Sequence, residues 1–363
     1  MLLKKLTINK FRNIERSVVE FDRKFNIFYG QNGQGKTNFL ESIFFLATLK
    51  SFRNSKQKEM LKWNENSCLL NCTIHDGNIG HELSVLFENN TKQLKIDDKS
   101  ASRIIDYCKT FTVVAFCPEE LIMINGAPDQ RRRYLDRAVF SSQPEYLKTY
   151  HDYYRILKQR NHLLKQRSYI DLDAWTEQLA KSGAKLIFER SNYLAKLSEG
   201  FASFYKNISG SDEEAGLCYH NSSYRDSFAQ NEIQAQLLGE IALSCRIEKE
   251  RGTTVVGPHR DDIEFYLNKR LIREHGSQGQ QKSFVMALKM AEIDYLGNMS
   301  GNVPVLLLDD MTAELDSSRI DHLMNFLVQR DMQVFITTTD KDSVPLPKGR
   351  ECSTFLVENG RIV

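Results

Sequence analysis

The stretch FNIFYGQNGQGKT at residues 25–37 decides the fold of this chain. Its first five residues predict a short buried strand, and the apolar run at 38–48 predicts a helix. The glycines therefore lie in a strand-to-helix turn, the context that the phosphate-binding pattern GxxxxGK[ST] requires. Amides of such a turn and of the helix N-terminus offer partial positive charge to an anion. A glycine turn without a ligand is the plain alternative, and the flanking elements count against it.

Each position of this turn has an expected part in binding a nucleotide. Glycine lets the backbone approach phosphates closely. Lys36 is expected to reach the β and γ phosphates, and the Thr37 hydroxyl to ligate Mg²⁺. ATP and Mg²⁺ are therefore the predicted cofactors, with Lys36 counted among the catalytic residues. The predicted contacts are Gly30, Gln31, Asn32, Gly33, Gln34, Gly35, Lys36 and Thr37.

A second piece of the site follows the apolar run VPVLLL at 303–308, which predicts a strand buried on both faces. This strand ends at Asp309 and Asp310, at the edge where parallel sheets bind ligands. Asp309 fits the carboxylate that holds magnesium, and Asp310 fits a residue that orients water. Both are predicted to be catalytic. An aspartate pair that caps the next element is the alternative, and the phosphate loop in the same chain makes it weaker.

A third piece, Ser277, Gln278, Gly279 and Gln280, precedes the helical pattern at 284–295. A serine, a flexible glycine and free amides at a helix start form an anion receptor. One chain has no obvious second use for such a receptor, which suggests that it contacts the nucleotide of a partner subunit. An N-cap in a polar loop is the alternative.

The long separation between these pieces predicts the domain organisation. We expect an α/β fold, an ABC-type P-loop ATPase head with a mixed sheet, whose halves are 1–117 and 251–363. A helical lobe at 118–250 is inserted between them, with helices expected at 131–140, 145–167, 173–197 and 231–251. The segment 208–221, with Ser209, Gly210 and Gly216, predicts a loop.

Basic residues gather on the expected helix at 145–167. Arg155, Lys158, Arg160 and Lys165 are the predicted DNA contacts, because closely spaced cations neutralise phosphates without reading sequence. A solvated helix face is the alternative and stays open.

Composition restricts the remaining choices. The chain has 363 residues and a formal net charge of +2, so any DNA surface must be local. Its seven cysteines form no CxxC pair, which favours reduced thiols over disulfides or a zinc site. No apolar run is long enough to span a membrane, and no signal peptide is recognised. A cytoplasmic protein with no membrane partner is expected.

Several blocks resemble a known family. GQNGQGKT, SQGQQKS, LLLDDMTAELDSSR and the string TTTD at 337–340 resemble the ABC-type ATPase heads of the SMC and Rad50 group. CPEELIMINGAPDQRRRYLD at 117–136 and VGPHRDD at 256–262 resemble, more narrowly, the RecF family of bacterial recombination mediators. With FRNI at 11–14 and SFR at 51–53, these blocks run from residue 11 to residue 340, so the resemblance extends over essentially the whole chain.

The resemblance implies roles for individual residues. Arg12 and Asn13 would approach the nucleotide, and Asp316 would lie in a loop that crosses the dimer interface. It also implies an ATP-dependent homodimer, binding to double-stranded DNA or to junctions of single and double strands, and RecR and RecO as partners. The implied activity helps to load recombinase at gaps and stalled forks. Asp310 stands in place of the usual glutamate and Thr339 in place of a switch histidine, so slow, DNA-stimulated hydrolysis is expected.

Two other functions remain possible from the sequence: the ATPase subunit of a transporter, and a nucleotide-gated scaffold without useful turnover. DNA-stimulated ATP turnover would separate them from the leading interpretation. The segment GPHRDD at 257–262 is expected to have a structural or nucleotide-coupling role, because no further metal ligands have suitable spacing.

Overall fold

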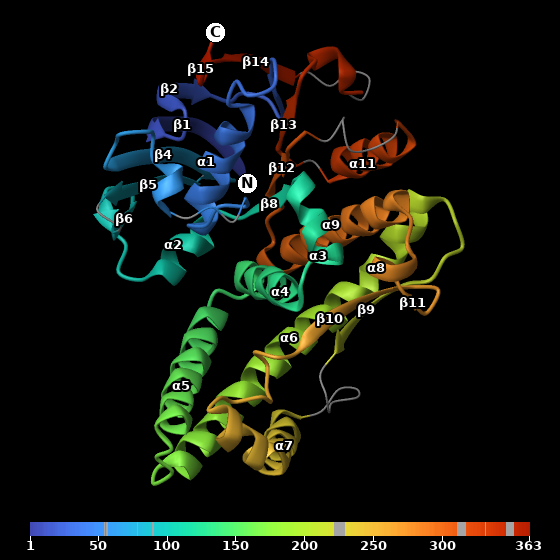
Figure 1. Ribbon diagram of the computed structural model, residues 1–363. Helices are drawn as coiled ribbons and strands as arrows, with labels where there is room; N and C mark the ends of the chain where they lie inside the picture. Colours follow the sequence, from blue (N-terminus) through green and yellow to red (C-terminus); the bar gives the residue numbers. More distant parts are fainter. Residues whose placement is uncertain are drawn as a thin grey trace. The chain divides into compact units, whose positions relative to one another are not determined.

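The computed structural model describes residues 1–53, 55, 57–77, 79–88, 91–220, 229–310, 317–330, 332–345 and 352–363. Contacts divide the chain into two compact units (Figure 1). Unit 1 comprises Met1–Leu121, Ser203–Asp212 and Gln278–Val363, and unit 2 comprises Ile122–Ala202 and Glu213–Ser277. Unit 2 thus reaches beyond 250, the predicted C-terminal limit of the insert.

The first sheet of unit 1 carries the phosphate loop and has the strand order β15-β14-β3-β13-β12-β8. Neighbouring strands within this sheet run parallel, except that β14 and β15 form an antiparallel hairpin. Strand β3 occupies the residues predicted for it, and every residue of β12 is buried, as the apolar run predicted. The bounds are β3 (Phe25–Tyr29), β8 (Val113–Phe116), β12 (Val305–Leu308), β13 (Val334–Thr338), β14 (Cys352–Glu358) and β15 (Arg361–Ile362).

The second sheet of unit 1 is antiparallel, with the order β2-β1-β4-β5-β6-β7. Buried residues alternate with more exposed ones along β4, as expected for a sheet with one face on the core. Its strands are β1 (Leu2–Phe11), β2 (Ile14–Glu20), β4 (Ser67–Asp76), β5 (Ile79–Glu88), β6 (Thr91–Ile96) and β7 (Lys99–Ser100).

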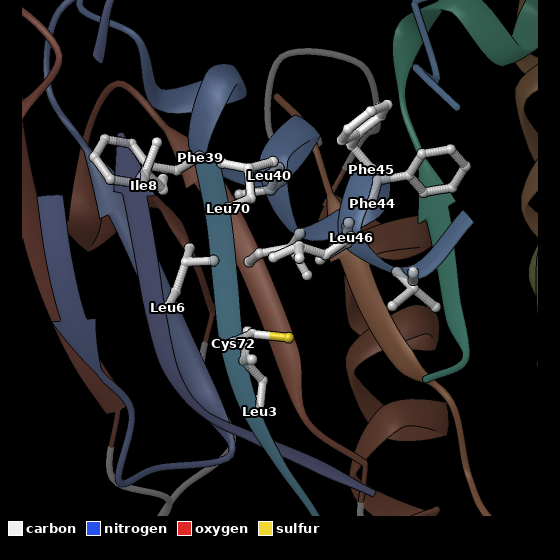
Figure 2. Close-up of a cluster of buried hydrophobic side chains, with 14 of the residues drawn as sticks. Leu3, Leu6, Ile8, Phe39, Leu40, Phe44, Phe45, Leu46, Leu70 and Cys72 are labelled. Atoms are coloured by element: carbon white, nitrogen blue, oxygen red, sulfur yellow. The ribbon is translucent and has the colours of Figure 1, made fainter. Parts of the chain in front are cut away.

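Helix α1 (Lys36–Thr48) is the centre of the core of unit 1. Figure 2 shows Phe39, Leu40 and Phe45 of this helix among side chains of β1 and β4. A helix that is apolar all round is stable only when buried on all sides. This packing fixes the helix start, and therefore the end of the phosphate loop, relative to both sheets.

The other helices of unit 1 border its sheets. Helix α9 begins at Gln278, earlier than the predicted 284, so the predicted anion receptor forms its first turn. Further along α9, Lys289 lies buried between Glu120 and Glu292, at 2.9 and 3.0 Å. The bounds are η1 (Gln57–Met60), α2 (Ile104–Thr110), η2 (Pro118–Leu121), α9 (Gln278–Ser300), α11 (Ser317–Gln329) and η3 (Lys341–Ser343).

Unit 2 combines helices with a small antiparallel sheet of order β11-β10-β9. The loop prediction for 208–221 is wrong in part, because β9 pairs there with β10. Helix α6 runs on past 197, and its residues from Ser203 belong to unit 1. The elements are α3 (Ile122–Asn125), α4 (Pro128–Ser142), α5 (Tyr146–Gln166), α6 (Leu172–Ser209), β9 (Ala215–His220), α7 (Gln230–Arg251), β10 (Asp262–Leu267), β11 (Arg270–Leu271) and α8 (Ile272–His275).

Within the described ranges, no helix is both long and apolar enough to cross a membrane.

Candidate nucleotide site and charged surfaces

The phosphate loop joins β3 to α1 at the edge where the parallel strands of unit 1 end. Its backbone has positive φ angles of 143°, 79° and 106° at Gly30, Gly33 and Gly35. An added Cβ would lie 2.5 Å from the Val357 carbonyl oxygen at Gly30, and 2.6 Å from Asn13 Oδ1 at Gly35. Both positions therefore favour glycine for conformation, and Gly30 also requires it for packing against backbone.

Lys36 lies inside the loop, while Gln31 and Asn32 are exposed. Its Nζ donates hydrogen bonds to the carbonyl oxygens of Gly30 at 2.7 Å and of Gln31 at 2.9 Å. Burial lowers the pKa of Lys36, and the charges of Asp310 and Asp309 act in the opposite direction. The ammonium group is therefore held by the loop carbonyls and is influenced by the charges of both aspartates that follow β12.

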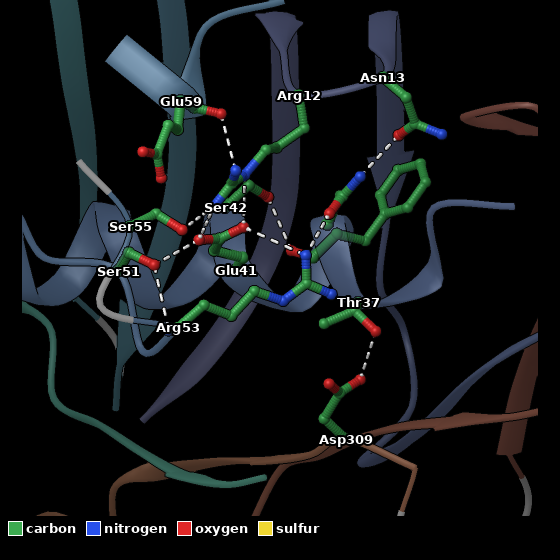
Figure 3. A network of polar contacts seen from close by, with 12 residues as sticks. Arg12, Asn13, Thr37, Glu41, Ser42, Ser51, Arg53, Ser55, Glu59 and Asp309 are labelled. Carbon is green, nitrogen blue, oxygen red and sulfur yellow. Dashed lines mark hydrogen bonds and ion pairs between the residues drawn. The ribbon is translucent and has the colours of Figure 1, made fainter. Parts of the chain in front are cut away.

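Two hydroxyl groups meet one carboxylate beside the loop. Thr37 Oγ1 donates to Asp309 Oδ1 at 2.8 Å, as Figure 3 shows. Thr337 Oγ1, from the end of β13, donates to the same oxygen at 2.7 Å. Hydroxyl and carboxylate oxygens are ligands that Mg²⁺ accepts. The structure thus brings the two predicted metal ligands together, and their donor atoms fit that ion.

Thr337 is a site residue whose contact the sequence reasoning missed. Its hydroxyl also accepts a hydrogen bond from the amide of Asp310, which has a positive φ of 50°. The signal was present in the sequence, because a polar residue that ends an apolar parallel strand lies at the ligand-binding edge. Thr337 holds both aspartates in place.

Arg12 and Asn13 differ in their relation to the loop. Arg12 Nε and Nη2 donate to the Glu41 carboxylate at 2.8 and 2.7 Å, and its Nη1 donates to the Glu59 carbonyl (Figure 3). Asn13 instead contacts the loop, with Nδ2 donating to the Gln34 carbonyl oxygen at 3.2 Å. Arg12 is thus held by α1, and a nucleotide contact by Arg12 stays a prediction.

The predicted receptor for a partner's nucleotide starts α9. Ser277 and Gln278 are exposed, and Gln280 is half-buried. An added Cβ at Gly279 would lie 3.1 Å from Arg319 Nη2, so α11 borders this turn. Asp316, the residue expected in the dimer-crossing loop, lies outside the described residues.

The exposed face of α5 carries most of the predicted DNA contacts. Arg155, Lys158 and Lys165 are exposed, and Lys148 lies on the same face one heptad before Arg155. Arg155 forms an exposed ion pair with Asp152 at 3.2 Å, which contributes little energy. The helix therefore presents a stripe of cations on one face.

Arg160 does not belong to this stripe, and its prediction as a DNA contact is corrected. Its side chain is 2% exposed, and Nη2 donates to the buried Glu248 carboxylate at 2.6 Å. Nη1 and Nε donate to the hydroxyls of Thr254 and Thr176 at 2.7 and 2.9 Å. A guanidinium with these buried partners cannot contact phosphates, and its role is to join α5 to α7 and α6.

The segment GPHRDD connects elements of unit 2. Nδ1 of His259 lies 2.6 Å from the Tyr153 hydroxyl, and its Nε2 lies 3.2 Å from the Thr254 carbonyl oxygen. Burial lowers the pKa of His259 to about 4, so the ring is neutral at pH 7. A neutral ring has one donor and one acceptor. It therefore donates to the carbonyl through Nε2 and accepts from the tyrosine through Nδ1.

Charged groups of the same segment are also paired inside unit 2. The Arg131 guanidinium binds both oxygens of Asp262, at 2.7 and 2.6 Å. Arg190, which is fully buried, donates to the Pro258 carbonyl oxygen at 2.7 Å. Tyr219 donates to Asp261 at 2.8 Å. These contacts give the segment a structural role.

Comparisons with known proteins agree over the whole chain. The family model "RecF/RecN/SMC N terminal domain" matches residues 2–360. A DNA replication and repair protein RecF from Geobacter metallireducens is 45% identical, with 100% of this chain and 99% of the relative aligned. A solved structure of the recombination mediator protein RecF with ATP, in the RecFOR pathway, has a TM-score of 0.91 at 31% identity, covering 100% of this chain and 98% of that one.

A more distant structure shows how widely the fold is shared. An Smc head bound to the C-terminal winged-helix domain of ScpA has a TM-score of 0.57 at 14% identity, covering 100% and 97% of the two chains. At this identity the likeness concerns the fold alone. The predicted ABC-type ATPase fold is confirmed by these matches.

Proposed function

The chain belongs to the RecF branch of the RecF/RecN/SMC family, and from this premise we propose that it is an ATP-dependent DNA-binding protein of DNA replication and repair. One observation carries the nucleotide part of the proposal. The hydroxyl of Thr37 and the carboxylate of Asp309, which are 272 residues apart in sequence, lie 2.8 Å apart beside the phosphate loop. This arrangement is what a bound nucleoside triphosphate with its metal requires.

In this proposal, different residues of the chain bind the phosphates, hold the metal ion and activate water. Amides of the loop and the Lys36 ammonium bind phosphates, and Thr37 and Asp309 would hold Mg²⁺. The ion, when bound, neutralises charge on the phosphates. Asp310 is the candidate base, and turnover is expected to be slow. Unit 1, which contains the phosphate loop and Asp309, binds the nucleotide, and the insert contacts DNA through α5 of unit 2.

We propose further that ATP closes a homodimer through the first turn of α9. The exposure of Ser277 and Gln278 supports this, because side chains that serve a partner must be accessible. A nucleotide shifts the equilibrium only by its differential affinity for the closed state. Gly279, Gln280 and Asp316 belong to the same proposed interface.

Replacing Ser277 with arginine should prevent ATP-dependent dimerisation while sparing ATP binding by each protomer. A bulky cation at this exposed position disturbs the interface but not the protomer's own phosphate loop. Sedimentation velocity with a non-hydrolysable ATP analogue should show a dimer for the wild type and a monomer for the variant. We expect the dimer dissociation constant to rise by at least about tenfold, or about 1.4 kcal/mol.

The matched control for this experiment is Ser100→Arg, at an exposed serine of β7. It should dimerise like the wild type. A wild-type protein that stays monomeric at saturating nucleotide would refute the dimer, and a dimeric Ser277→Arg variant would exclude α9 from the interface.

The stripe on α5 supports a sequence-independent DNA surface, and ATP turnover provides its test. Duplex DNA should stimulate phosphate release by the wild type. The double variant Arg155→Glu, Lys158→Glu should lose this stimulation and bind DNA with a salt slope smaller by about 2. Each cation that contacts a phosphate releases about one counterion, so two lost contacts change the slope by that amount.

The control Lys181→Glu, Lys185→Glu makes the same charge change on exposed positions of α6. It should keep the stimulation and the salt slope. If the two double variants had equal effects, the loss would result from the change in net charge and not from the α5 stripe. Turnover that no DNA stimulates would instead favour a nucleotide-gated scaffold.

Partners are proposed from the relatives. The solved relatives are described as parts of the RecFOR pathway, which supports RecR and RecO as partners of this chain.

A further inference from the structure

The C-terminal β14–β15 hairpin ends beside the phosphate loop. Strand β14 runs parallel to β3, with Leu356 opposite Tyr29, so both strands end at the same edge of the sheet. Asn359 and Gly360 then form a two-residue turn with φ angles of 51° and 74°. Such left-handed pairs are typical of tight hairpin turns. The chain's last residues are therefore carried to the ligand-binding edge.

Both amides of this turn bind a single residue of the loop. The amide of Gly360 donates to the Gln34 carbonyl oxygen at 2.8 Å, and the amide of Asn359 donates to Gln34 Oε1 at 2.7 Å. The Asn13 side chain donates to the same carbonyl at 3.2 Å. The middle of the phosphate loop is thus held from outside by three hydrogen bonds.

One glycine of the turn and one of the loop lie too close to neighbouring backbone for a side chain to fit. A Cβ at Gly360 would lie 2.5 Å from the Asn13 carbonyl oxygen, and one at Gly30 would lie 2.5 Å from the Val357 carbonyl oxygen. Contacts under 3.0 Å to backbone atoms require the backbone to move. Gly360 therefore lets the turn lie against the backbone of Asn13, whose side chain donates to Gln34, and Gly30 lets the start of the loop lie against β14.

The geometry of the peptide bond connects this contact to the ligand. A trans peptide is planar, with its C=O and N–H pointing to opposite sides. The carbonyl of Gln34 points to the hairpin, so the N–H of Gly35 points away from it. That amide belongs to the phosphate-binding pattern. Fixing the carbonyl from outside therefore fixes the direction of a donor inside the loop.

We propose that the Asn359-Gly360 turn is a positioning element of the ATP site, acting through Gln34 on the phosphate loop. The inference rests on the proposed ATP binding. The turn touches no phosphate itself; it preorganises the amides that do, which reduces the ordering cost of binding. The nucleotide site thereby includes the last residues of the chain.

Gly360→Ala tests the proposal through ATP affinity in the full-length protein. The added Cβ should collide with the Asn13 carbonyl oxygen and displace the turn, which breaks its two hydrogen bonds to Gln34. We expect ATP binding to weaken by about tenfold, the equivalent of two ordinary hydrogen bonds. Gln34→Ala, which removes one acceptor, should weaken it by about threefold. Because both substitutions act through one contact, their effects should not multiply. The double variant should bind ATP about tenfold more weakly than the wild type, whereas independent effects would weaken binding about thirtyfold. Calorimetric titration with ATP measures all three values.

Gly77→Ala is the matched control, because Gly77 is also a hairpin glycine with a positive φ of 57° but has open space around it. It should carry the same backbone strain and keep wild-type ATP affinity. A folded Gly360→Ala protein that binds ATP like the wild type would overturn the inference. If that variant does not fold, unchanged binding by Gln34→Ala overturns it equally. Wild-type protein that binds no ATP would remove the proposed function and this inference together.

Discussion

Replacing Arg160 with leucine should lower the free energy of unfolding by about 3–5 kcal/mol. The change leaves the Glu248 carboxylate buried without its cation, and Glu248 is 0% exposed. It also leaves the hydroxyl of Thr254 without the guanidinium donor that it accepts from. Removing one partner of a buried pair costs far more than the pair itself contributes. Urea unfolding followed by circular dichroism measures the difference.

Two variants decide whether the buried charge causes this loss. Arg160→Leu combined with Glu248→Leu removes both charges and should recover a few kcal/mol. Lys158→Leu, on the exposed face of the same helix, should change the free energy of unfolding by less than about 0.5 kcal/mol. A double variant no more stable than Arg160→Leu alone would show that lost packing is responsible. DNA binding by the folded double variant should equal that of the wild type.

The burial of Arg160 could be predicted from its position relative to the apolar residues of the same helix. Arg160 lies at the spacing of three and four residues from buried apolar residues of this helix, Ile156, Leu157 and Leu164. The density of basic residues predicts a DNA contact at Arg160, whereas the helical phase places this residue on the buried face of α5. The partner Glu248 is 88 residues away, and no local pattern pairs residues at that distance.

The same contrast between local and distant signals decides which other elements could be predicted from the sequence. Strand β3 and the start of α1 follow from apolar runs on either side of the glycines, because these signals are local. The segment that contains β9 predicts a loop, because Ser209, Gly210 and Gly216 lie there among acidic residues. Its ladder partner β10 begins at Asp262, opposite His220. Only the folded unit supplies the pairing that makes this segment a strand.

The site was predictable where one sheet edge collects its parts. Asp309 directly follows β12, and Thr37 follows the loop that leaves β3. Both strands are recognisable from the sequence, and their ends meet at one edge of the parallel sheet. The contact between Gln34 and the Asn359-Gly360 turn had no comparable signal. An Asn-Gly pair predicts a hairpin turn but not what the turn touches.

Replacing Asp309 with asparagine should abolish the Mg²⁺-dependent gain in ATP affinity. Asparagine has nearly the same shape, and its Oδ1 can still accept hydrogen bonds from Thr37 and Thr337, so the fold of the site should persist. What disappears is the negative charge. A metal ligand of this kind contributes several kcal/mol, so any ATP turnover should fall by about a hundredfold or more.

The measurement compares ATP affinity in excess Mg²⁺ with that in a chelator, for three proteins. Wild-type protein should bind ATP more tightly with the ion, whereas the affinity of Asp309→Asn should be nearly the same in both conditions. Asp310→Asn is the matched control: it removes the same charge one residue later, and it should keep the Mg²⁺ dependence while losing turnover as the candidate base. If Asp309→Asn keeps the full Mg²⁺ dependence, the carboxylate beside Thr37 does not hold the metal, and its bond to Thr37 is structural. If both variants lose the dependence equally, the two aspartates hold the ion together, and the hydrogen bond from the Asp310 amide to Thr337 helps to fix the second of them.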